Sequence, residues 1–136
     1  MKNKKPNKLK KVFRLWVNKL PCTSETFSII DEVEINLDFK TELQKKRNFL
    51  GELPKFFNSY DKAKNYAVKF LERMLKDQTI RLEKWKGKLE RLDKKIEWAR
   101  MKRYQCEIKH CEHWIKVCQK KLDKWMPQSV RYIMED

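Results

Sequence analysis

The chain has 136 residues and a formal net charge of +15; 40% of its residues are hydrophobic and 39% are charged, with only two glycines and four prolines. One packed core is feasible at this length, whereas a collagen-like chain, a Gly/Ser linker and a loop-rich disulfide scaffold are excluded. No stretch approaches the run of roughly 18 apolar residues that spans a bilayer, so no membrane-spanning helix is expected.

Positive charge is concentrated in two regions. Residues 1–20 carry eight basic and no acidic residues, residues 21–60 carry five and seven, and residues 61–126 carry twenty and ten. Such regions attract polyanions, including RNA, DNA and acidic protein surfaces. Lysine outnumbers arginine by 26 to 8, which favours contacts to phosphate over bidentate recognition of bases.

The first third of the chain predicts a basic arm and a small antiparallel sheet. Residues 1–11 are too polar to bury themselves and are expected to be disordered. Alternating apolar residues predict strands from Lys10 to Lys19 and from Phe27 to Phe39. Antiparallel pairing would place the acidic outer face of the second strand near Arg14 and Lys19. The side chains expected to point inward are Phe13, Leu15, Val17, Phe27, Ile29, Val33, Ile35, Leu37 and Phe39.

Residues 40–57 fit more than one structure. Thr41 to Phe49 is compatible with a short helix or a third strand, and Gly51 and Pro54 indicate turns. Because an isolated two-stranded hairpin is only marginally stable, the sheet needs a third strand or a helix packed against it.

The chain is strongly helical in pattern from residue 58 onward. Asn58 or Ser59 can cap a helix, and Asp61 suits its first turn. Apolar residues then recur at steps of three and four, which predicts heptad seams. The first seam consists of Val68, Leu71, Leu75, Gln78, Leu82, Trp85, Leu89, Leu92, Ile96 and Ala99, and the second of Tyr104, Ile108, Cys111, Ile115, Cys118, Leu122 and Trp125.

A step of five from Ala99 to Tyr104 puts the two seams out of phase. Either one long helix contains a skip residue, or the chain reverses near Arg100 to Arg103 and forms an antiparallel hairpin. Mutual burial of the seams favours the hairpin, whereas the lack of Gly, Pro or Asn at the turn favours the single helix. The predicted fold class is α+β: after the arm (1–11), a small N-terminal antiparallel β-sheet (12–57), a coiled-coil-like helical hairpin or single long helix (58–126) and a C-terminal tail (127–136).

A basic stripe accompanies the first seam, with Trp98 among its lysines and arginines. Ammonium groups can contact phosphates, and an indole can stack on a base. The alternative is a solvated helix face stabilised by i,i+4 ion pairs, but it leaves an excess of ten positive charges over residues 61–126 unexplained. The predicted nucleic-acid-binding residues, from the arm, first strand and stripe, are Lys4, Lys5, Lys8, Lys10, Lys11, Arg14, Lys84, Lys88, Arg91, Lys95, Trp98 and Lys102.

Catalytic residues, cofactors and metal sites are not expected. The chain has no glycine-rich phosphate loop and no nucleophile elbow. Cys106, His110 and His113 share a helix face, but seven residues cover about 10 Å of helix, so the three cannot bind one metal ion. A complete site would need a ligand from elsewhere, such as Cys22. Reduced thiols and the lack of a signal cleavage site favour a cytoplasmic protein.

These features predict a non-enzymatic, basic nucleic-acid-binding accessory protein, with RNA or a ribonucleoprotein favoured over specific DNA. The alternative is a small protein-interaction modulator, of phage or mobile-element type, that docks its basic helical surface on an acidic surface of a host enzyme or of the transcription machinery. A homodimer through the heptad seam is compatible with the same pattern, and membrane binding is not expected. No motif is specific enough to indicate a family.

Overall fold

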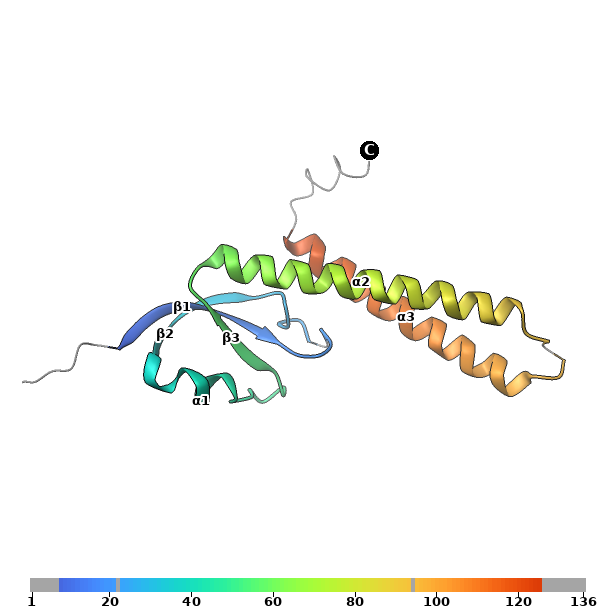
Figure 1. Ribbon diagram of the computed structural model, residues 1–136, viewed down its shortest axis with the longest axis horizontal. Coiled ribbons are helices and arrows are strands. Elements are labelled where there is room, and N and C mark those ends of the chain that lie inside the picture. Colours follow the sequence, from blue (N-terminus) through green and yellow to red (C-terminus); the bar gives the residue numbers. More distant parts are fainter. Residues whose placement is uncertain (1–7, 22, 94, 126–136) are drawn as a thin grey trace, which may run out of the picture. The chain divides into compact units, whose positions relative to one another are not determined.

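The computed structural model describes residues 8–21, 23–93 and 95–125. It confirms the α+β class, with a three-stranded antiparallel sheet followed by two long helices. The chain divides into two compact units, Met1–Lys69 and Phe70–Asp136. In chain order the elements are β1 (Leu9–Val17), β2 (Ile30–Asn36), the 3-10 turn η1 (Leu37–Phe39), α1 (Lys40–Gln44), β3 (Leu53–Phe57), α2 (Tyr60–Glu90) and α3 (Trp98–Trp125), as Figure 1 shows.

Strand β1 is the centre of the sheet, whose strand order is β2-β1-β3. It begins at Leu9, so Lys10 and Lys11 are strand residues and not part of a disordered arm. Val12 and Leu15 lie on opposite faces of β1, yet both are buried, at 3% and 0% exposure. The sheet is therefore covered on both faces of its central strand, whereas the alternation predicted one inner and one outer face.

One face, which we call the Phe13 face, is covered by the beginning of α2. The rings of Phe13 and Tyr60 meet edge to face with centroids 6.2 Å apart, and those of Phe57 and Tyr66 are 5.5 Å apart. Ser59 caps the helix as predicted, since its Oγ accepts a hydrogen bond of 3.2 Å from the N–H of Lys62. The first turns of α2 thus belong to the same compact unit as the sheet.

The opposite face, which we call the Arg14 face, is covered by α1 and the segment after it. In the region from Thr41 to Phe49, the residues up to Gln44 are helical, which is one of the two structures that the sequence allows there. The third strand begins at Leu53. Pro54 is tolerated because β3 is an edge strand. Proline has no N–H to donate, and no strand lies on the outer side of β3 to accept a hydrogen bond from one.

Strand β2 is shorter than its alternating pattern predicted. Phe27 has a positive φ of 57° and is 1% exposed, and its N–H donates to the carbonyl of Trp16 at 3.0 Å. At the other end, the Asn36 side chain accepts from the N–H of Asp38 at 2.9 Å and starts the 3-10 turn. Leu37 and Phe39 consequently lie on the surface, at 46% and 52% exposure, instead of pointing inward.

A buried carboxylate joins two loops of the first unit. Glu52 is 0% exposed, and its two carboxylate oxygens accept hydrogen bonds from Thr23 Oγ1 at 3.0 Å and from Asn48 Nδ2 at 3.1 Å. Asn48 in turn accepts from the backbone N–H of Glu52 at 2.9 Å. A carboxylate this deeply buried requires such donors, so the network ties the loop before β2 to the turn that starts β3.

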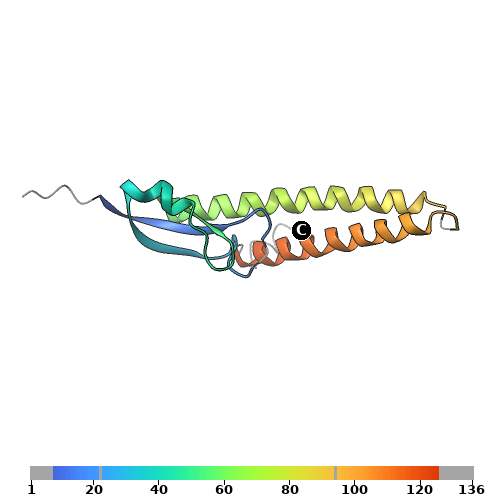
Figure 2. The same cartoon turned by 90° about the horizontal axis from the view of Figure 1, so that it is seen from below.

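In the second unit, α2 and α3 form the antiparallel hairpin rather than one continuous helix. Both cartoon views show the two helices side by side after a reversal of the chain (Figures 1 and 2). Trp85 of α2 and Tyr104 of α3 pack with ring centroids 5.4 Å apart. Every position of the first seam up to Leu92, and every position of the second, is buried or half-buried.

The chain reverses earlier than the sequence predicted, at residues 91–97 and not at Arg100 to Arg103. Asp93 takes the role that Gly, Pro or Asn would normally have: its side chain accepts from the N–H of Lys95 at 3.1 Å, and its carbonyl from the N–H of Glu97 at 2.9 Å. Ile96 and Ala99 were assigned to the first seam, but they lie beyond it and are exposed.

Two seam cysteines are buried in the hairpin. Cys111 and Cys118 are 3% and 0% exposed, whereas Cys106 is exposed. Burial raises the pKa of the Cys118 thiol to about 11, against the opposing effect of Lys121, and burial with the nearby Glu107 raises the pKa of Cys111. Both thiols therefore behave as small apolar groups that stay protonated near neutral pH.

We expect Glu52→Ala to lower the free energy of unfolding by about 1–3 kcal/mol, because Thr23 and Asn48 lose the acceptor of their hydrogen bonds. Glu42→Ala, at an exposed position of α1, is the matched control and should change it by less than about 0.5 kcal/mol. Urea denaturation measures both variants. Equal stability of the two would show that the buried network contributes nothing.

We also expect an alkaline loss of stability that depends on Cys118. Because folding raises the pKa of this thiol from 9.0 to about 11, its contribution is complete below pH 9 and is lost as the pH rises toward 11. The loss is roughly 2 kcal/mol or less. Denaturation across this pH range should show a shallower decline for Cys118→Ala than for wild type, and no change of slope for Cys106→Ala. Parallel declines in all three proteins would contradict the assignment.

Candidate nucleic-acid interface

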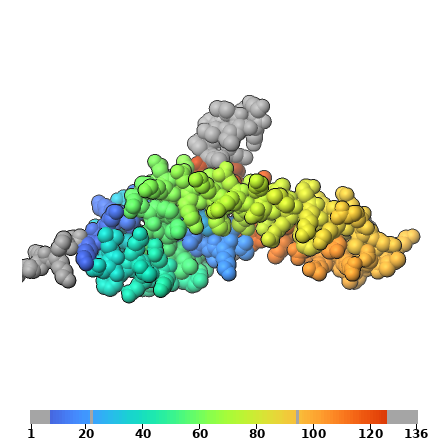
Figure 3. Space-filling view, viewed as in Figure 1, coloured from blue at the N-terminus to red at the C-terminus, as the bar shows by residue number. Residues whose placement is uncertain are grey.

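The end of the helical hairpin carries a concentrated positive charge. We call residues 84–103 the hairpin tip; they comprise the last turns of α2, the connecting turn and the first turns of α3. The tip contains nine lysines and arginines against three acidic residues. In the space-filling view, the chain segments on the two sides of the turn lie against each other at this end (Figure 3).

The structure brings the predicted helical stripe together at the tip, although not along one helix face. The reversal of the chain at Asp93 breaks the heptad numbering that assigned the stripe to a single helix. The stripe residues are Lys84 and Lys88 in the last turns of α2, Arg91 directly after it, Lys95 in the connecting turn, and Trp98 and Lys102 at the start of α3.

Trp98 is the most accessible tryptophan of the tip. It is 61% exposed, and the neighbouring Ile96 is 80% exposed. The Nζ atom of Lys102 lies 5.5 Å from the centroid of the indole ring. An exposed indole beside an ammonium group presents a stacking surface next to a positive charge, which is the combination that single-stranded nucleic-acid sites use.

Trp85, in the last turns of α2, has a different role from Trp98 at the start of α3. It is half-buried and packs on Tyr104 of α3. Lys88 and Lys84 lie over its ring, with Nζ atoms 4.7 Å and 6.0 Å from the centroid. The indole therefore holds the hairpin together and supports two of the predicted cations, and it does not form an open stacking surface.

Few of the described lysines and arginines of the tip have an acidic partner among the described residues. Arg100 forms an ion pair of 2.9 Å with Glu97. Among the described residues of the tip, no other lysine or arginine forms an ion pair. Exposed charges of this kind are screened by salt over about 10 Å at moderate ionic strength, so binding through them should depend steeply on salt.

Two of the predicted cations of the first unit, Lys8 and Lys10, are in contrast engaged by neighbouring side chains. Lys8 pairs with Asp38 at 3.0 Å, and Lys10 donates to Asn58 at 3.2 Å. Lys11 is exposed on β1, opposite Glu34. Lys4 and Lys5 lie outside the described residues.

Arg14 forms a bidentate ion pair across strands β1 and β2. Its Nε and Nη2 atoms donate to the two carboxylate oxygens of Asp31 at 3.1 Å and 2.6 Å. The acidic outer face that was predicted to lie near Arg14 includes Glu32 and Glu34. These two residues instead lie on the Phe13 face, opposite Phe13 and Lys11. The partner is Asp31 because the register places it directly opposite Arg14.

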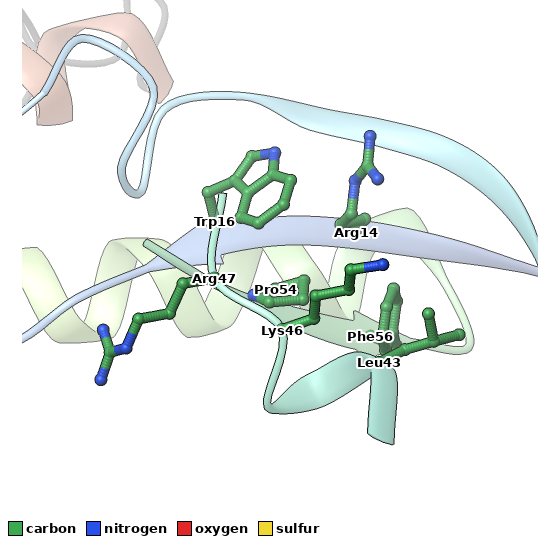
Figure 4. Close-up of a pocket in the computed structure, with 7 residues that line it drawn as sticks. All are labelled: Arg14, Trp16, Leu43, Lys46, Arg47, Pro54 and Phe56. Atoms are coloured by element: carbon green, nitrogen blue, oxygen red, sulfur yellow. The ribbon is translucent and has the colours of Figure 1, made fainter. Parts of the chain in front are cut away.

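A second feature is a pocket on the Arg14 face, which was not predicted from the sequence. Arg14, one of the predicted binding residues, lines this pocket together with Trp16, Lys46, Pro54 and Phe56 (Figure 4). The short basic run at residues 45–47, followed by a phenylalanine-containing strand, is a signal that sequence reasoning missed.

The candidate metal ligands do not form a site among the described residues. No group of three or more His, Cys, Asp or Glu side chains there is arranged to hold a metal ion. His113 packs edge to face on Trp114, with ring centroids 4.9 Å apart. Cys22, the ligand suggested from elsewhere in the chain, lies outside the described residues.

The chain matches no protein-family model, no curated protein and no solved structure. In the part of the chain that the structure describes, no helix is both long enough and apolar enough to cross a membrane.

The two tip tryptophans should differ in their effect on stability. Trp85→Ala is expected to lower the free energy of unfolding by about 2 kcal/mol or more, because it removes the ring that packs on Tyr104. Trp98→Ala should change it by less than about 0.5 kcal/mol, because that ring is mostly solvent-exposed. Thermal or urea denaturation of the two variants tests this contrast. A large loss in Trp98→Ala would mean that its ring is part of the packed hairpin.

Proposed function

We propose that the protein is a non-enzymatic nucleic-acid-binding accessory protein that contacts phosphates through the hairpin tip. The observation that carries this proposal is Trp98, an indole exposed to 61% in a segment with nine basic and three acidic residues. Ile96, two residues before Trp98, is also exposed, and exposed apolar residues that lie together mark interaction sites, whereas single ones are normal on protein surfaces. The Lys102 ammonium group beside the ring forms no ion pair among the described residues. A base could therefore stack on the indole while its phosphate contacts this ammonium group.

RNA or a ribonucleoprotein is favoured over specific DNA. The exposed cations of the tip are mostly lysines, which bind phosphate as point charges and read no base edges. Stacking on an indole requires a base that is not already stacked in a duplex, and such bases are common in RNA loops and single strands. We place this function in the cytoplasm, in agreement with the free thiols of Cys106, Cys111 and Cys118.

A second candidate function is docking on an acidic protein surface as a modulator of a host enzyme or of the transcription machinery. Ile96 favours it, because an isoleucine exposed to 80% beside an exposed tryptophan resembles the apolar anchors of protein interfaces more than a phosphate contact. A homodimer through the heptad seam stays a prediction; it would have to open the hairpin, since Trp85 and Tyr104 of one chain already pack together.

The proposed function is tested by neutralising the tip with Lys84→Gln, Lys88→Gln, Arg91→Gln and Lys95→Gln together. Glutamine retains an amphipathic side chain over Trp85, so the hairpin should stay folded. Anisotropy measures binding of labelled single-stranded RNA, duplex RNA and duplex DNA between about 50 and 200 mM salt. For single-stranded RNA we expect affinity to fall by about tenfold or more, and the slope of log K against log salt to become shallower by roughly 3.

The matched control removes the same charge from exposed positions farther along α3. It combines Lys109→Gln, Lys116→Gln, Lys120→Gln and Lys124→Gln, and should weaken binding much less. Trp98→Ala alone should weaken single-stranded RNA binding by roughly fivefold to a hundredfold, which is the usual worth of one stacked base. Equal losses of RNA affinity in the two quadruple variants would mean that binding depends on the net charge of the chain and not on the tip. That outcome would favour the protein-docking candidate.

A further inference from the structure

The pocket on the Arg14 face is built by the register of two strands. Arg14 lies directly opposite Phe56, and Trp16 lies directly opposite Pro54. Residues opposite each other in an antiparallel pair share a face, so these four side chains form one contiguous patch on the Arg14 face of the sheet. Leu43, in α1, adds a wall, and the pocket has a volume of about 230 Å³ (Figure 4).

This patch combines flat apolar surfaces with a guanidinium group, that of Arg14, which an ion pair holds in place. The guanidinium carbon of Arg14 lies 4.9 Å from the centroid of the Trp16 ring. Its bidentate pair with Asp31 uses two of the five guanidinium N–H groups, so three N–H donors are left for a ligand. Asp31 thereby orients Arg14 and neutralises much of its charge.

Lys46 supplies the uncompensated charge of the pocket. Its side chain runs along the pocket with the ammonium group directed toward Phe56 (Figure 4). Among the described residues, no carboxylate forms an ion pair with Lys46. Arg47 also lines the pocket, but its guanidinium points away in Figure 4 and donates to the carbonyl of Gly51 at 2.7 Å. The ligand is thus expected to be a planar group that carries a negative charge at the Lys46 side.

We infer that this pocket binds one nucleotide unit, with the base against Trp16 and Pro54 and the phosphate at Lys46 and Arg14. The volume is smaller than the roughly 300–1,000 Å³ of pockets that take drug-sized ligands, so it suits a single ring system better than a peptide segment. Aromatic side chains that project from a sheet are a general means of stacking bases. This inference concerns the first compact unit alone and does not rest on binding at the hairpin tip.

The nucleotide can be a free nucleoside monophosphate or a residue of a single-stranded RNA, because both present the same base and phosphate. The full chain labelled with ¹⁵N separates the two sources, because each indole N–H is an individual signal and Trp16→Phe identifies that of Trp16. We expect adenosine or uridine monophosphate to shift this signal with a Kd of roughly 1 mM or below. A single-stranded tetranucleotide that binds more tightly at the same signal indicates RNA as the source, and weaker binding indicates the free nucleotide.

Two adjacent exposed lysines provide a matched pair of variants. Lys46→Gln should weaken nucleotide binding at the Trp16 signal by about fivefold, because it removes the charge-assisted contact to phosphate. Lys45→Gln, whose side chain does not line the pocket, should change it by less than about twofold. Nucleoside without phosphate, and inorganic phosphate without a base, should both bind more weakly than the nucleotide.

The inference would be overturned by no shift of the Trp16 signal with any nucleotide, by an equal response to inorganic phosphate alone, or by tighter binding of an acidic aromatic peptide than of the nucleotide. Equal effects of Lys45→Gln and Lys46→Gln would do the same. Shifts at the Trp98 signal report on the hairpin tip separately. The pocket and the proposed function of the tip can therefore fail independently.

Discussion

The pairing of β1 with a strand on each side is the constraint on which the first unit depends. Because β1 is central, its register decides which side chains of β2 and β3 meet those of β1. It places Asp31 and Phe56 on either side of Arg14, and it places Tyr60 over Phe13 once β3 leads into α2. A shift of either strand pairing by one residue would turn the side chains of the shifted strand to the other face of the sheet. The buried Glu52 network stabilises this arrangement by tying together the loops that enter β2 and β3.

The two units use positive charge in different ways. In the sheet, Lys8 and Arg14 are paired with carboxylates, so they contribute to the register and orientation of the strands. At the hairpin tip most cations have no acidic partner among the described residues, and three of them lie over indole rings. Surface ion pairs contribute little to stability, so leaving these cations unpaired costs the fold little. It keeps a strong positive field at one end of the hairpin.

The tryptophans illustrate how similar local sequences acquire different roles. Trp85 and Trp98 each have a lysine three or four residues away that lies over the ring. Trp85 faces α3 and packs on Tyr104, whereas Trp98 follows the turn and is left in solvent. The difference arises from the turn at Asp93, which changes the direction of the chain between them. Heptad numbering across the turn could not reveal it.

Local patterns in the sequence predict the α+β class, the first and second strands, a helix cap at Asn58 or Ser59 and the two apolar seams, because periodicity and capping are local properties. The sequence also shows the concentration of basic residues around Trp98. The position of the hairpin turn follows from the folded structure, since Asp93 accepts hydrogen bonds from Lys95 and Glu97 within the turn, and no apolar pattern records them. The partner of Arg14 and the pocket beside Trp16 were likewise decided by strand register. Register depends on contacts between residues far apart in the chain, which a pattern read along one strand does not contain.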